Sequence, residues 1–210
     1  MHNDNELNEE ECGHLARILL ASRRVTLRHH FFSWVHGPLQ SLIPHEILLC
    51  GVADESGYLL HERFTACRYF KDDHYHRVIH PGDGLVSHLA QEWQIAGAPC
   101  LIAALPEEPG GWNARLGDLE LKNVAFHGMN WINGQIKGYA SFSRVRAPFD
   151  GRLALYLDIL LPHLLATLAR VLANESRASV DSKRPAGLIT AREVEVLTWV
   201  RDGKTNDEIA

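Results

Sequence analysis

The densest group of side chains that could do chemistry lies in the segment KDDHYHRVIHPGD. Its candidate metal ligands are His74, His76 and His80 with Asp72 and Asp73. A His-x-His pair on a strand places both imidazoles on one face, and a third ligand would complete an open, catalytic type of zinc site. The segment lacks an H-E-x-x-H signature, however, and a polar surface stretch explains the same residues. We favour the polar surface stretch and expect neither a metal nor another cofactor.

The sequence lacks the short signatures of common catalytic sites. There is no G-x-S-x-G elbow, no Gly-rich phosphate loop and no recognisable Cys-His motif. The cysteines lie far apart, and three of the four have apolar neighbours, as small core residues do in a reducing cytoplasm. They are Cys12, Cys50, Cys67 and Cys100. We therefore expect no enzymatic activity, with a metal- or histidine-dependent enzyme using residues 72–80 as the alternative.

Large aromatic residues offer a different kind of site. Four tryptophans occur within patterned segments: Trp34, Trp93, Trp112 and Trp131. Together they could line a pocket for a small-molecule effector. Large aromatics at patterned positions are more typical of a core, which is the interpretation we favour.

Two capping boxes stand close together near residue 200. Thr190 and Glu193 form the first, and Thr205 and Glu208 form the second. Apolar residues at helical spacing lie between them, and Gly203 suits the left-handed position that ends a helix. Two helices joined by so short a turn are typical of a helix-turn-helix.

These residues resemble the start of a LuxR-type (GerE) DNA-binding domain. The matching positions are Thr190, Arg192, Glu193, Leu197, Gly203, Lys204, Asn206, Glu208 and Ile209. The resemblance implies a transcriptional regulator in which an N-terminal domain controls a helix-turn-helix, whose second helix reads bases in the major groove. Since that helix has barely begun at residue 210, we expect promoter DNA to be bound by the full-length protein and not specifically by these 210 residues.

The resemblance does not extend to the usual ligand pattern. Many LuxR-type regulators hold an acyl-homoserine lactone with a W-x-x-x-Y and D-P pattern, but Trp34 has no tyrosine four residues later and no Asp-Pro occurs. Any small-molecule effector is therefore expected to differ. The stretch HHFFSWVHGPLQSLIPHEILL, residues 29–49, resembles LuxR-type regulators associated with exopolysaccharide biosynthesis.

The periodicity of apolar residues predicts helices separated by antiparallel strands. Helices are expected over residues 4–25, 27–39, 85–95 and 150–173, and strands over residues 47–53, 58–68, 99–105, 121–131 and 135–145. Asn133-Gly134 is the dipeptide typical of a type I′ hairpin turn. Because an isolated hairpin is marginal, both hairpins should share one sheet with helices packed on a face. The expected class is α+β, an antiparallel sheet flanked by helices that is similar in layout to GAF or autoinducer-binding domains. The start of an all-α helix-turn-helix is expected to follow it.

Composition sets the remaining boundaries. Residues 1–173 are expected to form the regulatory domain, the polar residues 174–187 a linker, and residues 188–210 the truncated helix-turn-helix. A net charge of −5 gives no sign of a basic surface, so DNA binding is inferred from the motif alone. The acidic N-terminus and the lack of an apolar run of about 20 residues predict a cytoplasmic protein with no membrane association.

A homodimer is expected because operators read by helix-turn-helix proteins are commonly two-fold. Its candidate interface is an apolar stripe formed by Leu161, Leu164, Leu168 and Leu172, with a core helix as the alternative. Pro162 is expected to kink or split that helix. A protein-interaction module without any small ligand is a further alternative for the whole chain.

Overall fold

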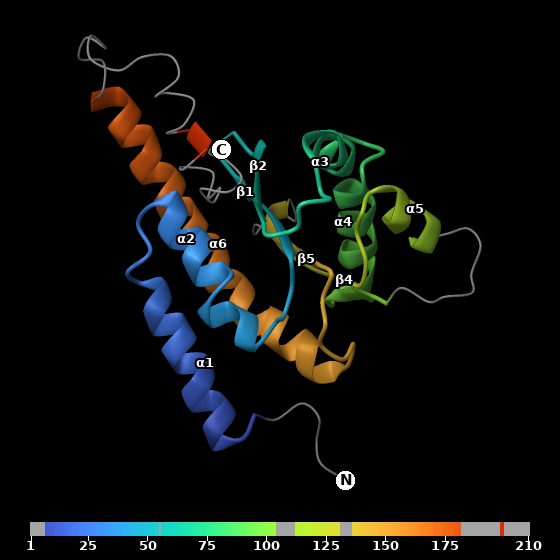
Figure 1. The fold of residues 1–210 in the computed structure, drawn as a ribbon, viewed down its shortest axis with the longest axis horizontal. Coiled ribbons are helices and arrows are strands. Elements are labelled where there is room, and N and C mark those ends of the chain that lie inside the picture. The colour runs from blue at the N-terminus through green and yellow to red at the C-terminus, as the bar shows by residue number, and fades with distance from the viewer. Residues whose placement is uncertain (1–6, 55, 104–111, 131–135, 182–197, 200–210) are drawn as a thin grey trace.

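The computed structural model describes residues 7–54, 56–103, 112–130, 136–181 and 198–199 (Figure 1). In chain order the elements are α1 (Glu9–Ser22), α2 (Arg28–Val35), the 3-10 helix η1 (Pro38–Ser41), β1 (Ile47–Ala53), β2 (Leu59–Thr65), α3 (Asp72–Ile79), α4 (Leu85–Ala96), β3 (Cys100–Ile102), α5 (Trp112–Asp118), β4 (Val124–Asn130), β5 (Ile136–Ser143) and α6 (Gly151–Asp181).

The strands form one antiparallel sheet in the order β2-β1-β5-β4-β3. Both predicted hairpins are present, and β1 of the first pairs directly with β5 of the second. Leu48, for example, lies between Phe64 on β2 and Phe142 on β5. The α+β class and the single sheet are therefore confirmed. The expected Asn133-Gly134 turn lies outside the described residues.

Helices cover both faces of this sheet, in agreement with the predicted sheet flanked by helices (Figure 1). Leu48 and Cys50 of β1 face a core shared with α1, α2 and α6. Ile47 and Leu49 of the same strand face a second core shared with α3, α4 and α5. A strand buried on both sides needs a continuous apolar run, which is what β1 contains. Cys50 and Cys67 are buried free thiols, as predicted.

Helix α6 is the longest element, and it corrects the predicted start of the linker. Residues 174–181 are helical because tertiary contacts hold them: Asn174 Nδ2 donates to the Thr26 carbonyl at 3.0 Å, and Glu175 pairs with Arg28. Pro162 lies inside the helix and does not split it. The division into a regulatory domain and a helix-turn-helix stays a prediction.

The leucine stripe of α6 belongs to the core of a single chain. Leu161, Leu164 and Leu168 are at most 3% exposed, and Leu172 packs against the same cluster. The candidate dimer interface is therefore wrong, and the core alternative is correct. By length and composition alone, residues 151–178 could also cross a membrane, but core helices of soluble proteins pass that test too. Packing on the sheet accounts for the buried leucines.

Gly138 on β5 is required by a close approach between elements. A Cβ at this position would lie 2.6 Å from the Gly51 carbonyl oxygen and 2.8 Å from a Leu165 methyl. We expect Gly138→Ala to lower the free energy of unfolding by about 1–3 kcal/mol, measured by urea denaturation. Gly13→Ala on α1 is the control: it meets no atom within 4 Å and should gain about 0.5–1 kcal/mol through helix propensity. Equal effects at both sites would contradict this account.

Candidate ligand site

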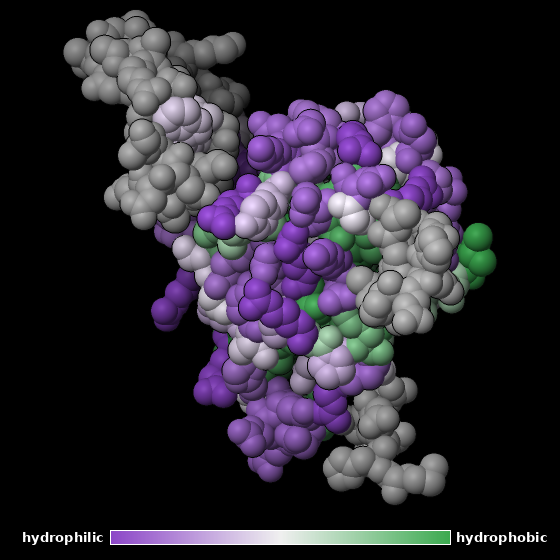
Figure 2. All heavy atoms as spheres, turned by 45° about the vertical axis from the view of Figure 1, so that its right-hand side comes forward, coloured by the Kyte–Doolittle hydropathy of each residue, from purple (hydrophilic) through white to green (hydrophobic). Residues whose placement is uncertain are grey.

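A groove of about 590 Å³ opens where the β1–β2 hairpin meets α3 and α4. It is lined by Tyr58, Leu59, His61, His76, Ile79, His80, Pro81, Gly82, Val86, Ser87, Ala90, Gln91 and Gln94. We call it the α3–α4 groove. Among the described residues of this lining there is no lysine, arginine, aspartate or glutamate, so this part of the groove suits an apolar ligand body with neutral polar groups. Elsewhere on the described part of this side, the surface is mostly hydrophilic (Figure 2).

His61 carries the most defined polar group of the groove. Its Nδ1 lies 2.8 Å from the hydroxyl of Tyr139, a fully buried residue on β5. Gly51 makes room for that tyrosine, since a Cβ there would lie 2.5 Å from the ring. Burial raises the pKa of Tyr139 and lowers that of His61, so both groups are neutral near pH 7. In the His61 tautomer protonated at Nε2, the phenol donates to Nδ1 and the Nε2 proton is left as a donor for a ligand.

Tyr75 and Arg63 hold α3 against β2 beside the groove. The Tyr75 hydroxyl donates to the His61 carbonyl at 2.9 Å, and the Arg63 guanidinium lies 5.1 Å from the centre of the Tyr75 ring. Arg63 also pairs with Asp72 at 2.7 Å. Burial raises the pKa of Tyr75, so its hydroxyl stays protonated and remains a donor. These contacts fix the His61 backbone, and with it the direction of the imidazole.

The 72–80 segment is helix α3 with its C-cap, so the proposed His-x-His strand is wrong. The histidines serve different contacts: His74 Nδ1 accepts from the Lys71 amide at 3.2 Å, and His80 pairs with Asp83. His76 and His80 line the groove. Among the residues that the structure describes, no three His, Cys, Asp or Glu side chains are placed to hold a metal ion. The geometry thus gives the metal-dependent alternative no support.

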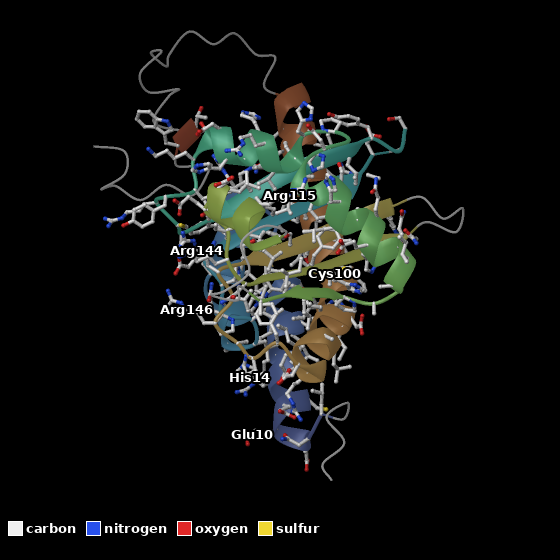
Figure 3. All side chains as sticks on the ribbon, turned by 90° about the vertical axis from the view of Figure 1, so that its right-hand side faces the viewer. Glu10, His14, Cys100, Arg115, Arg144 and Arg146 are labelled. Atoms are coloured by element: carbon white, nitrogen blue, oxygen red, sulfur yellow. The ribbon has the colours of Figure 1, made fainter. Side chains whose placement is uncertain are left out.

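His76 and His80 also border a second hollow of about 420 Å³ between α3, the start of α4 and α5. Its charged lining balances, with Arg77 and Arg115 against Asp83 and Asp118. Arg115, labelled in Figure 3, comes from α5 and lies 3.5 Å from the His88 ring. Because the hollow has no excess of either charge, it offers no preference for an anion or a cation.

Two of the four tryptophans, Trp34 and Trp93, lie on opposite faces of the sheet and cannot line one pocket together. Trp34 is buried in the α6 core, where its Nε1 donates to the Ile18 carbonyl at 3.0 Å. Trp93 is buried in the core on the other face of the sheet, against Gly128. Trp131 and the side chain of Trp112 lie outside the described residues. The favoured interpretation of tryptophans as core residues is confirmed for Trp34 and Trp93.

The residues of the DNA-binding motif all lie outside the described part of the chain. They are Thr190, Arg192, Glu193, Leu197, Gly203, Lys204, Asn206, Glu208 and Ile209. In the described domain, several arginines are paired with carboxylates: Arg144 with Glu120 at 2.9 Å, and Arg146 with Glu46. Figure 3 labels both arginines on one side of the molecule. Their pairing fits the acidic net charge.

The stretch HGPLQSLIPHE folds compactly around Gln40. Its amide donates to the His45 carbonyl at 2.6 Å and accepts from the His45 backbone amide at 3.0 Å. The His45 ring is 5% exposed, with Nδ1 2.6 Å from the Ile43 carbonyl and Nε2 without a partner in the described residues. Burial lowers the pKa of His45 to about 4, although the bond to Ile43 opposes the shift.

His45 should make stability depend on pH. Because its folded pKa is about 4 and its unfolded pKa about 6.5, the unfolded chain gains a proton between these values while the folded chain does not. Stability is therefore lost as the pH falls from about 6.5 to about 4, at up to about 1.4 kcal/mol per pH unit. In urea denaturation at several pH values, His45→Asn, which keeps a donor for Ile43, should reduce this slope. The same change at the exposed His163 is the control, and equal slopes in wild type and His45→Asn would refute the assignment.

Comparison with known proteins finds solved structures of similar fold. No protein-family model and no curated protein matches the sequence. Among solved structures, the chain is similar to the N-acylhomoserine lactone-dependent LuxR family transcription factor CepR2 from Burkholderia cenocepacia. The TM-score is 0.52 at 14% identity, with 80% of this chain and 99% of that chain covered.

Two further matches have TM-scores below 0.5. SdiA of Escherichia coli gives 0.45 at 17% identity, covering 93% of this chain and 81% of that one. The GAF domain of a phosphoenolpyruvate-protein phosphotransferase from Coxiella burnetii gives 0.44 at 12% identity, covering 79% and 96%. The α+β fold, a sheet with helices on both faces, is thus similar to that of CepR2. At these identities the comparisons show the fold and not the ligand.

Sequence reasoning missed the groove itself. His61, Ser87 and Gln91 stand in three different segments, and no spacing in the sequence brings them together. The one available signal was the alternation of β2, which sets His61 and Arg63 on the same face of a strand that is otherwise half-buried.

Proposed function

We propose that this chain is the regulatory part of a cytoplasmic, homodimeric LuxR-type transcriptional regulator, and that residues 188–210 begin its DNA-binding domain. A small molecule bound in the α3–α4 groove controls how that domain engages promoter DNA. The target genes include those for exopolysaccharide biosynthesis, as the resemblance of residues 29–49 implies.

The observation that carries this proposal is a coincidence of two independent features in one chain. The described residues between positions 7 and 181 adopt a fold similar to that of a LuxR family transcription factor. The sequence that follows α6 carries paired capping boxes and a Gly-Lys-x-Asn turn that resemble that family's DNA-binding domain. The two features lie in different parts of the chain, so neither implies the other. Their order along the chain is the one expected of a regulatory domain followed by the DNA-binding domain that it controls.

The groove supports a ligand unlike the N-acylhomoserine lactone on which CepR2 depends. Its described lining has no carboxylate to receive the amide of such a lactone, and offers neutral donors and acceptors from His61, Ser87, Gln91 and Gln94 instead. Apolar side chains such as Leu59, Ile79 and Val86 supply the remaining contacts. An uncharged amphipathic molecule with an oxygen acceptor for His61 Nε2 satisfies these groups.

DNA binding is tested with the full-length protein and a DNA fragment from upstream of its own gene, by fluorescence anisotropy at physiological salt. We expect a dissociation constant of about 10⁻⁸ M or lower, and much weaker binding to unrelated DNA. Lys204→Glu should weaken binding, whereas Lys122→Glu, in the regulatory domain, should leave it unchanged. Failure to prefer any fragment of the genome over random DNA would remove the proposed function.

The ligand is tested by mass spectrometry of small molecules that co-purify with the protein. Ser87→Trp fills the groove and should abolish recovery of the ligand. Ala96→Trp is the matched control, since it adds the same side chain to an exposed position of α4 that does not line the groove. Equal recovery from both variants would place the ligand elsewhere.

A further inference from the structure

A single arginine joins three elements that are far apart in the sequence. Arg28, at the start of α2, donates from Nη2 to Glu62 of β2 at 3.0 Å, and its Nη1 also contacts Glu62. The same guanidinium donates from Nε and Nη2 to Glu175 of α6 at 3.1 and 3.0 Å. The three side chains are 15%, 18% and 28% exposed. We call this cluster the Arg28 triad.

The β2 end of the triad is adjacent to the candidate ligand site. His61 and Glu62 are consecutive on β2, so their side chains leave opposite faces of the sheet. The register agrees: His61 lies opposite Gly51 on the side of the second core, and Glu62 lies opposite Cys50 on the side of α6. One strand therefore presents His61 to the α3–α4 groove and Glu62 to Arg28.

The α6 end of the triad lies where the helix leaves the body of the domain. Arg170 donates to the Ser22 and Val25 carbonyls, Asn174 to the Thr26 carbonyl, and Glu175 accepts from Arg28. These bonds go to the last residue of α1, to the α1–α2 connection and to α2. The end of α6 extends beyond α2 (Figure 1), and residues 188–210 follow it in the sequence.

We propose that the Arg28 triad transmits occupancy of the α3–α4 groove to the C-terminal end of α6. This inference rests on the proposed function and specifies how the groove is coupled to the output. The guanidinium satisfies both carboxylates only at the present spacing of β2 and α6, because bidentate charge-assisted bonds depend steeply on geometry. A ligand that moves β2 at His61 also moves Glu62. The strength of the hydrogen bonds between Arg28 and Glu175 then changes.

The charge state of Arg28 supports this role. Burial alone would lower its pKa, but the hydrogen bonds and charges of Glu62 and Glu175 outweigh burial and raise it. The guanidinium therefore remains charged at every physiological pH. It cannot release its partners by losing a proton, so movement of β2 or α6 is what changes the triad.

Amide hydrogen exchange of the peptide covering residues 170–181 tests the coupling in the protein itself. Glu62→Gln changes a residue on β2 that does not belong to this helix, yet we expect exchange there to become about tenfold faster, the factor given by loss of one charge-assisted bond. Arg28→Lys keeps the positive charge but loses the planar guanidinium that binds two carboxylates at once. It should therefore also accelerate exchange of residues 170–181. Glu11→Gln is the control because Glu11 pairs with Arg152 at the opposite end of α6. Unchanged exchange in Glu62→Gln, alongside acceleration in Glu175→Gln, would overturn the proposal.

A second set of variants in the same experiment tests whether the α3–α4 groove is coupled to the Arg28 triad. Ser87→Trp should change exchange of residues 170–181 by about threefold or more in the wild-type background, and not in the Glu62→Gln background. Ala96→Trp should change it in neither. An equal change in both backgrounds, or in neither, would overturn the route through Glu62. These measurements need no DNA, so failure of the full-length protein to bind a promoter would remove the proposed function without changing their outcome.

Discussion

Replacing Arg28 with methionine is expected to lower the free energy of unfolding by about 3–5 kcal/mol, because it leaves two carboxylates close together without their cation. Glu62 and Glu175 are 18% and 28% exposed, so water screens them only in part. Urea denaturation followed by far-UV circular dichroism gives the free energy directly. This is one of the two largest effects that we expect from a single substitution in the described domain.

Removing the two carboxylates as well should restore most of that loss. The triple variant Arg28→Met, Glu62→Gln, Glu175→Gln contains no unpaired charge, and replacing buried ion pairs by neutral groups is often neutral or stabilising. A triple variant as unstable as Arg28→Met alone would mean that the arginine acts by packing on Phe64, whose ring centre lies 5.9 Å from the guanidinium carbon. The comparison therefore separates charge from packing.

The spacing of apolar residues predicted an element correctly where only one kind of structure explains that spacing. The apolar run 47–53 is β1 with the predicted bounds, because a strand buried on both faces requires such a run. Helix α4 differs from its predicted range by one residue, since Leu85, Leu89 and Trp93 form one buried stripe and Gly97 takes the left-handed cap.

Helix ends set by distant contacts could not be predicted in this way. Residues 174–181 look like a linker in isolation, and they are helical because Thr26 and Arg28, far away in sequence, bind Asn174 and Glu175. The 72–80 segment is polar and rich in histidine, with no clear apolar period. Tyr75 and Val78 nevertheless hold it as a helix against β2 and the second core. In both cases tertiary contacts override a weak local preference.

The candidate ligand site also depends on contacts between residues that are distant in the sequence. The groove exists because the β1–β2 hairpin, α3 and α4 meet at one edge of the sheet, and each contributes only a few lining residues. Residue type offered the tryptophans as the alternative pocket, beside the favoured core role, and Trp34 and Trp93 are separated by the sheet. The pairing of His61 with Tyr139 joins residues 78 positions apart, and only the order of the strands brings them together.

The substitution Leu168→Glu is expected to unfold the domain and not simply to separate two subunits. Leu168 is completely buried in the core between α6 and the sheet. An ionised carboxylate without a partner there should lower the free energy of unfolding by more than about 4 kcal/mol, a large part of the usual stability of a domain. We expect loss of the cooperative thermal transition in circular dichroism and a chain that aggregates during purification.

Ala166→Glu provides the matched control because Ala166 is exposed on the same helix, two residues earlier. It should change stability by less than about 0.5 kcal/mol, as exposed helical substitutions usually do. If the protein is a homodimer, light scattering of this variant also shows whether the outer face of α6 contributes to the interface, which the buried leucines cannot do within a folded chain. A Leu168→Glu protein that folds as stably as Ala166→Glu would show that α6 is not packed on the sheet as described. The buried stripe would then again be available as the contact between subunits.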